Sequence, residues 1–230
     1  MPGGTLMGGA NIDAGVTALL AQDARAGFFG KMPARGDFLR ENLPRDFTDS
    51  WDGWWQRGLV ETQASAGNAW LEAWLEAPVW RFVLPPGLCG RQGVLGVWLP
   101  SVDKSGRYFP LTIAAVAAGD WAAHVGAMTA FLDAAEAAGR DALEFDLSPT
   151  ALLERVQAGL APGAAPEDGG TLAEPGLASW WTEGGPRVAP RHATGAALPT
   201  GDDFATLIDD AWAGSRPGAP VMISGILDPS

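Results

Sequence analysis

Residues 79–117 decide the fold, and they read VWRFVLPPGLCGRQGVLGVWLPSVDKSGRYFPLTIAAVA. The stretch holds three runs rich in β-branched and aromatic residues, a composition typical of strands. Pro-Pro-Gly at 85–87 and Asp-Lys-Ser-Gly at 103–106 separate the runs, and these residue types favour turns. The pattern predicts three sequential strands, the last two joined by a turn at 103–106. These strands are expected at 79–84, 93–99 and 108–117.

The residues before this stretch indicate one more strand and two helices. Residues 1–26 mix glycine, alanine and small polar residues, so we expect a flexible N-terminal extension with at most one loose helix. The run Gly27 to Lys31 is apolar and bounded by glycines, which favours a strand. Apolar residues, four of them aromatic, then recur at helical spacing over 47–59. A shorter helix is expected at 70–75, with Asn68 as its N-cap.

The residues after the stretch predict further helices and strands, and together they indicate one α/β domain over 27–228. Because helices are expected before, between and after the strands, we expect a central sheet covered on both faces. The Pro/Gly/Ala-rich residues 161–176 are typical of a mobile loop. The expected elements are helices at 121–135 and 149–159, a strand at 177–182, a last helix capped by Asp202 or Asp203, and a strand at 221–224.

Composition favours a large apolar core and a cytoplasmic protein. Hydrophobic residues make up 47% of the 230-residue chain and charged residues 18%, which is typical of a globular domain. The longest apolar runs fall well short of the roughly 20 residues that span a bilayer. The N-terminus lacks the basic segment of a signal peptide. The single cysteine, Cys89, cannot form an internal disulfide, which agrees with a reducing compartment.

The net charge of −12 is spread unevenly. There are 10 basic and 11 acidic residues up to Ala118, but 5 basic and 16 acidic residues from Gly119 onward. Such an acidic half argues against nucleic acid, and against an anionic membrane, as partner. It would tolerate a basic protein surface, although solubility alone also explains it.

Two strings resemble catalytic motifs but lack the required neighbours. Gly30-Lys31 resembles the end of a phosphate-binding loop, yet Arg25 stands where the first glycine should be and Met32 replaces the Ser/Thr that holds magnesium. Ser101 and Lys104 match an S-x-x-K pattern, but Pro100 and Gly106 around them favour a turn over the helix that such a serine nucleophile needs. We therefore expect no catalytic residue in these strings.

Metal and acid–base chemistry lack residues at useful spacing. The only histidines, His124 and His192, are far apart in sequence, and Cys89 stands alone, so no metal site or cofactor is expected. The neighbouring carboxylates Asp202 with Asp203, and Asp209 with Asp210, point in different directions on a helix. Helix capping and surface exposure explain these pairs better than a catalytic dyad does.

Three blocks of the chain resemble the TagF (ImpM) proteins associated with bacterial type VI secretion. They are residues 27–38, residues 51–59 followed by 77–82, and residues 99–111. The resemblance implies a three-layer α/β/α sandwich, for which we expect a central mixed β-sheet. It also implies a cytoplasmic, non-enzymatic accessory protein that acts as a post-translational negative regulator through a forkhead-associated scaffold, Fha. Some members carry a fused phosphatase domain, for which this chain has no room.

The blocks place charged residues beside turn-forming glycines and prolines, and these are the candidate site residues. The expected turn residues are Gly30, Pro33, Gly36, Pro78, Pro100, Gly106 and Pro110. The polar residues beside them are Lys31, Arg35, Asp37, Arg81, Ser101, Asp103, Lys104 and Arg107. One interpretation is a single polar surface, with an aromatic rim, that binds a partner protein. The other is that the charges pair internally and hold the turns in place. An enzyme or small-ligand sensor with a site between the 30–37 and 101–107 turns is the alternative function.

Most of the tryptophans lie at core positions of the expected helices and strands. Trp180 and Trp181 differ, because adjacent residues of a strand point to opposite faces and cannot both enter one core layer. We therefore include these two in the candidate partner-binding surface.

Overall fold

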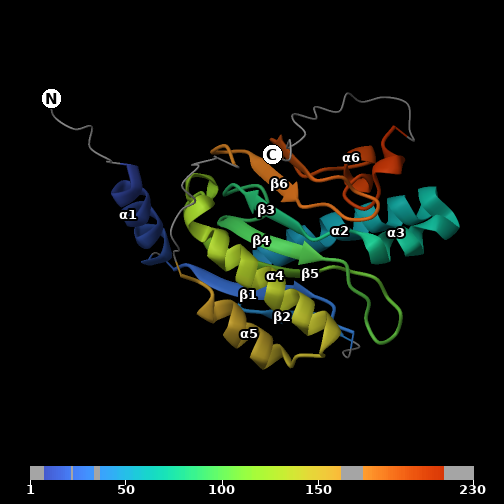
Figure 1. Ribbon diagram of the computed structural model, residues 1–230, viewed down its shortest axis with the longest axis horizontal. Coiled ribbons are helices and arrows are strands. Elements are labelled where there is room, and N and C mark those ends of the chain that lie inside the picture. The colour runs from blue at the N-terminus through green and yellow to red at the C-terminus, as the bar shows by residue number, and fades with distance from the viewer. Residues whose placement is uncertain (1–7, 22, 34–36, 162–172, 215–230) are drawn as a thin grey trace.

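The computed structural model describes residues 8–21, 23–33, 37–161 and 173–214. Within these residues the chain is an α/β protein built on one sheet. Its strands are β1 Arg25–Gly30, β2 Leu39–Glu41, β3 Trp80–Leu84, β4 Gly93–Leu99, β5 Leu111–Ala117, β6 Ala178–Thr182 and β7 Arg191–Gly195. They are ordered β2-β1-β5-β4-β3-β6-β7 across the sheet (Figure 1). The predicted strands β3, β4 and β5 thus form its centre.

Every neighbouring strand pair in this sheet is antiparallel, so the prediction of a mixed sheet is wrong. Parallel pairs are missing from the described sheet because of which strands the helices connect. A helical connection makes a parallel pair only when it returns the chain beside the strand it left. Here β2 and β3, which a helical segment joins, are separated by three strands, and β5 and β6 are separated by two.

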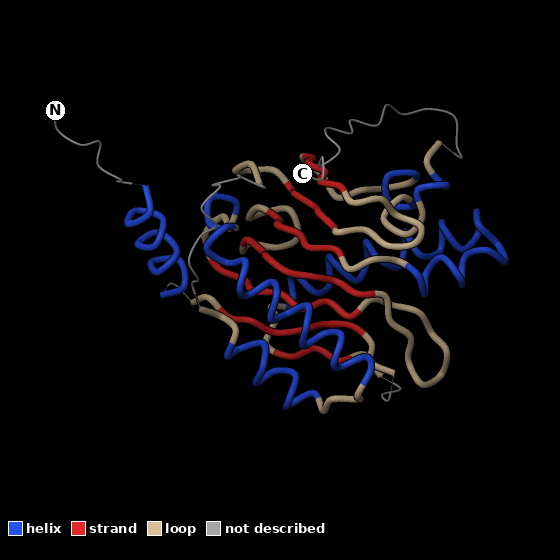
Figure 2. The backbone as a smooth tube through the Cα atoms, in the orientation of Figure 1, coloured by secondary structure: helices blue, strands red, loops and turns tan. Residues whose placement is uncertain are grey.

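The helices cover both faces of the sheet (Figures 1 and 2). The longer ones are α1 Gly8–Ala21, α2 Arg45–Ala66, α3 Trp70–Glu76, α4 Thr129–Glu144 and α5 Pro149–Ala158. Short ones are α6 Asp202–Ala205 and the 3₁₀ turns η1 Gly67–Ala69, η2 Ala122–His124, η3 Gly126–Met128 and η4 Asp210–Trp212. One apolar core lies between the sheet and α1, α4 and α5. The other lies between the sheet and α2, α3 and α6.

Side chains of each strand alternate between the two cores, as a pleated sheet requires. In β4, Val97 belongs to the core under α4, and the next residue, Trp98, belongs to the core under α2. Trp180 and Trp181 of β6 divide in the same way, and both are buried. Because helices cover both faces of the sheet, opposite orientation does not bring either tryptophan to the surface. Trp180 and Trp181 are therefore core residues, and their assignment to the partner-binding surface is wrong.

The core between the sheet and α2 is rich in tryptophan, so it also contains the polar indole N–H groups. Trp51 stacks on Trp180 with 5.9 Å between ring centroids and 4° between ring planes. The Trp51 Nε1 donates to Thr112 Oγ1 at 2.9 Å, and the Trp80 Nε1 donates to the Leu207 carbonyl at 2.9 Å. A buried indole that finds an acceptor avoids the cost of an unpaired N–H group. These bonds therefore tie α2 to β5, and β3 to the segment after α6.

Several helix ends differ from the expectations. α1 packs Val16 and Leu19 into the core, so residues 14–21 are not a loose extension. Asn68 lies within a 3₁₀ turn and caps no helix. The helix expected from Trp121 begins only at Thr129, after two 3₁₀ turns. The strands β2 and β7 escaped prediction because one is three residues long and the other is mostly polar. The strand expected at 221–224 lies outside the described residues.

Candidate functional site

The two polar turns of the sequence meet at one end of the sheet, where β1 ends and the connection from β4 to β5 turns. Gly30 ends β1 with φ of 135°, and a Cβ there would lie 1.9 Å from the Pro110 carbonyl oxygen. Only glycine permits both the backbone angle and this close approach. The next residue, Lys31, is buried, and its carbonyl accepts a hydrogen bond from Ser101 Oγ at 2.9 Å. The first turn is therefore fastened directly to the second.

A buried ion pair joins the same two turns. The Lys31 ammonium donates to Asp103 Oδ2, and both side chains are almost fully shielded from solvent. Asp103 also accepts from the backbone N–H of Ser105 at 2.8 Å and of Arg107 at 3.0 Å, and from Arg107 Nε at 2.7 Å. Burial alone would raise the pKa of the Asp103 carboxyl, but the hydrogen bonds from Lys31, Arg107 and Ser105 outweigh burial and hold this pKa well below its ordinary value.

The turn around Asp103 is a closed hairpin with an exposed tip. Val102 pairs with Tyr108, and the Asp103 N–H donates to the Arg107 carbonyl at 3.0 Å. Gly106 takes φ of 77°, which completes the turn at a position that favours glycine. The side chains of Lys104 and Ser105 are exposed, and the Arg107 side chain is 57% exposed. The buried carboxylate thus orders a loop whose outer residues face solvent.

Aromatic residues border this loop. Lys31 Nζ lies 4.7 Å from the ring centroid of Phe38, and the rings of Phe38 and Phe109 meet edge to face at 4.7 Å between centroids. Phe38 is nevertheless 44% exposed, and Asp37 beside it is exposed as well. Phe38 escaped the list of candidate residues. The sequence feature that could have identified Phe38 is its position: it is an aromatic residue directly after a charged turn, and it lies outside every strand and helix expected from the sequence.

The remaining candidate residues lie elsewhere or outside the described residues. Arg81 reaches from β3 to α4, where it pairs with Asp133 at 2.7 Å and Glu136 at 3.0 Å. Arg35 and Gly36 lie outside the described residues. Lys31, Ser101 and Asp103 are buried, so their side chains act within the turns; a surface at this end consists of Asp37, Phe38, Lys104 and Arg107. Pro78 and Pro110 are buried, and Pro33 and Pro100 are half-buried.

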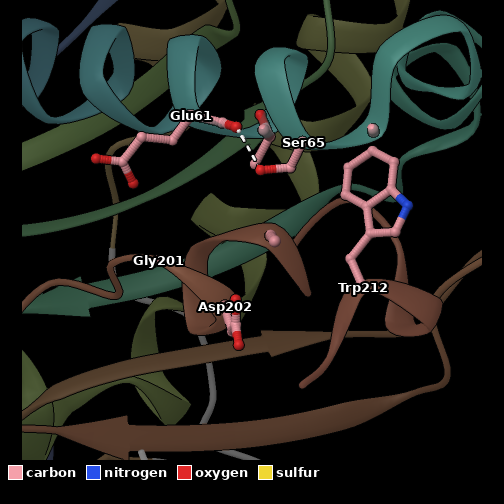
Figure 3. A pocket seen from close by; sticks show the side chains of 8 residues that line it. Glu61, Ser65, Gly201, Asp202 and Trp212 are labelled. Carbon is pink, nitrogen blue, oxygen red and sulfur yellow. Dashed lines mark hydrogen bonds between the residues drawn. The ribbon is translucent and has the colours of Figure 1, made fainter. Parts of the chain in front are cut away.

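A cavity of about 380 Å³ lies at a different place, between the end of α2 and the α6–η4 segment (Figure 3). Its lining residues are Glu61, Thr62, Ser65, Ala66, Gly201, Asp202, Ala205 and Trp212. None of them belongs to the 30–37 or 101–107 turns. This cavity was not predicted from the sequence, because Asp202 has the pattern of a helix cap and Trp212 that of a core residue.

Metal-binding clusters and membrane-spanning helices are both absent from the described part of the chain. No three or more His, Cys, Asp or Glu residues there lie together in a way that would hold a metal ion. Among the same residues, no helix is both long and apolar enough to cross a membrane.

Comparison with known proteins decides the family. The model of the TagF N-terminal domain, described as type VI secretion system-associated, matches residues 27–158, which is more than half of the chain. The chain belongs to the TagF family. All three blocks that carried the resemblance lie within the matched residues, so the family prediction is confirmed. A TagF-family chain is thereby a type VI secretion-associated protein.

A solved structure supports the fold of this TagF-family chain. The crystal structure of PA0076 from Pseudomonas aeruginosa PAO1 is 29% identical in sequence and superposes with a TM-score of 0.71. The match covers 88% of this chain and 100% of that chain. Curated protein sequences give no significant match.

Proposed function

We propose that this TagF-family protein is a cytoplasmic, non-enzymatic accessory protein of a bacterial type VI secretion system. It acts as a post-translational negative regulator by binding another protein, for which a forkhead-associated scaffold of the Fha type is our candidate. Family membership supports the association with secretion. The helices on both faces of the sheet also support the three-layer α/β/α description that we keep for the fold.

The loop held by Asp103 is the observation that carries the binding proposal. A buried carboxylate with four hydrogen bonds orders the 103–107 turn, so its exposed residues lose little conformational freedom when a partner binds. Lys104 and Arg107 offer positive charge there, and the half-exposed Phe38 offers an apolar contact. Aromatic and arginine residues are the types that most often dominate binding energy at protein interfaces.

The same geometry favours binding over catalysis at these turns. A catalytic lysine or carboxylate needs access to its substrate. Lys31 and Asp103 are shielded from solvent and neutralise each other. The cavity between α2 and α6 takes no lining residue from these turns.

The test combines affinity capture with a secretion assay in the source bacterium. Deletion of the gene should increase secretion, and wild-type protein should restore repression and capture the scaffold. The double variant Lys104→Ala, Phe38→Ser should lose both activities while it stays folded, although its melting temperature should fall somewhat because the Phe38 ring also packs against Phe109. The matched control is Arg57→Ala, Val60→Ser, which changes exposed residues of α2. Unchanged secretion in the deletion strain would contradict the regulatory role.

A further inference from the structure

The chain contains two lysines, Lys31 and Lys104, and the structure separates them by exposure. The Lys31 side chain is 3% exposed, and its ammonium donates to the Asp103 carboxylate. Lys104 is exposed, and no ion pair or hydrogen bond holds its side chain among the described residues. A reagent that attacks amines therefore reaches Lys104 in the folded protein, whereas Lys31 becomes accessible only when the two turns open.

The carboxylate next to Lys104 in the sequence does not neutralise it. Asp103 is turned inward, where it accepts hydrogen bonds from Lys31, from Arg107 Nε and from the backbone N–H groups of Ser105 and Arg107. The Asp103 side chain is fully shielded from solvent. Because these donors occupy the carboxylate inside the turn, the Lys104 amine lies outside it without a counter-charge from its neighbour.

The turn is also locally positive, although the chain carries a net charge of −12. Lys31, Lys104 and Arg107 bring three positive charges against the one negative charge of Asp103. The exposed Asp37 on the neighbouring turn still leaves this balance positive. A positive region attracts anions over a range of about 10 Å at ordinary ionic strength. Small anionic reagents therefore meet an attractive charge at Lys104.

We propose that Lys104 is an acylation site whose donor is an acyl phosphate. The Lys104 amine, after losing a proton to water, attacks the acyl carbon. A C–N bond forms, the bond from that carbon to the phosphate oxygen breaks, and inorganic phosphate leaves with the electron pair. The product is a neutral amide, so the turn loses one positive charge. Acylation thereby switches off partner binding at this surface, and this consequence, unlike the reaction itself, rests on the proposed function.

Acylation of Lys104 leaves the turn itself closed. The Asp103 N–H donates to the Arg107 carbonyl at 3.0 Å, and the Gly106 N–H donates to the Asp103 carbonyl at 2.9 Å. Among the described residues, no hydrogen bond that closes the turn involves the Lys104 side chain. The acyl group therefore lies in solvent on an ordered turn, where it changes the charge offered to a partner without unfolding the loop.

The test treats the full chain with acetyl phosphate and locates the added acetyl groups by peptide mapping and mass spectrometry. Because only the neutral amine attacks, the reaction is run at about pH 8. We expect acetylation of Lys104 at a rate close to that of free Nα-acetyl-lysine amide. Lys31 should react at least about a hundredfold more slowly, because its amine is accessible only in the opened turns. In guanidinium chloride, where the chain is unfolded, both lysines should react, which shows that the Lys31 peptide is detected.

Two comparisons test the donor and the residue. Added salt should slow acetylation by acetyl phosphate, because it screens the attraction between the turn and the anion, and should leave acetylation by the neutral ester p-nitrophenyl acetate unchanged. Lys104→Arg keeps the charge and removes the amine, so the reaction at this position should stop while scaffold capture continues. Lys104→Gln imitates the neutral amide and should lose capture, as the acetylated wild type does. Both variants should stay folded because Lys104 is exposed.

Any of four results would overturn the proposal: no acetylation of Lys104, equal rates at both lysines of the folded protein, the same salt dependence with both donors, or capture of the acetylated protein as efficiently as of the unmodified protein. Peptide mapping needs no partner. If neither the wild type nor Lys104→Arg captures the scaffold, the proposed function fails, and the mapping still decides whether Lys104 is the acylation site.

Discussion

The charge balance of the Lys31–Asp103 pair offers a direct test of how the two turns are held together. The change is Asp103→Asn, which keeps the shape of the side chain and its acceptor for the Ser105 and Arg107 N–H groups. It places an amide where Lys31 Nζ and Arg107 Nε both donate. Lys31 then becomes a buried ammonium without a counter-charge, and breaking a buried pair in this way costs about 3–5 kcal/mol.

The companion variants separate the pair from the rest of the turn. Lys31→Met leaves Asp103 with three other N–H donors, so we expect a smaller cost of about 1–3 kcal/mol. The double variant removes both charges, and it should be more stable than the sum of the single effects predicts. Directly contacting residues show coupling energies of about 0.5–3 kcal/mol, and we expect the upper half of that range because the pair is buried.

The assay is urea unfolding, followed by the fluorescence of the buried tryptophans, at neutral pH. Midpoints and slopes give the free energy of unfolding for the wild type, both single variants and the double variant. Asp37→Asn is the control, since it neutralises an exposed carboxylate, and it should stay within about 0.5 kcal/mol of the wild type. Additivity of the single effects within about 0.5 kcal/mol would refute the coupled pair.

Three further predictions follow from named contacts. The pKa of Asp103 in the folded protein is depressed below its ordinary value of 3.8, so on acidification the unfolded chain takes up the proton first. The difference in free energy of unfolding between the wild type and Asp103→Asn should therefore shrink below about pH 4. Urea titrations at several pH values measure this difference, and a constant difference would contradict the prediction. Gly58→Ala should destabilise the protein by about 1–3 kcal/mol because its Cβ meets the Phe204 ring at 2.3 Å, whereas Gly53→Ala on the same helix, near only the flexible end of Arg57, should gain up to about 1 kcal/mol. Ser148→Ala removes the N-cap hydrogen bond to the Ala151 N–H of α5 and should cost about 1 kcal/mol by thermal unfolding, with no loss expected for Ser105→Ala.

Much of the local structure follows from patterns of a few residues. The three central strands appear within three residues of their predicted ends, because β-branched runs between turn formers leave few alternatives. The helices 45–66 and 149–158 follow from apolar periodicity and from proline near the first turn. The strands β2 and β7 were not predicted because they lack an apolar run. They are strands because their backbones pair with β1 and β6 respectively, which the sequence pattern does not show.

The candidate site was predictable in its residues but not in their exposure. The sequence placed Lys31 and Asp103 in polar turns, and it offered internal pairing and a recognition surface as alternatives. Their contact spans 72 positions of sequence, so no local pattern shows that they meet or that solvent is excluded. Exposed candidates such as Lys104 and buried ones such as Asp103 are neighbours in sequence, and only packing separates them.

The sequence by itself determined the strand runs, the turns at Gly30 and Gly106, the two-sided burial pattern and the TagF family, because each depends on residue type and short-range spacing. The tertiary structure alone decided the antiparallel strand order, the burial of both Trp180 and Trp181, the closed Lys31–Asp103 pair and the cavity beside Trp212. Each of these depends on which distant segments of the chain cover a given face of the sheet, and no short stretch of the 230-residue sequence contains that information. The buried Lys31–Asp103 pair illustrates this: both residues are charged and lie in turns, yet their side chains are almost fully shielded from solvent because the two turns pack against each other.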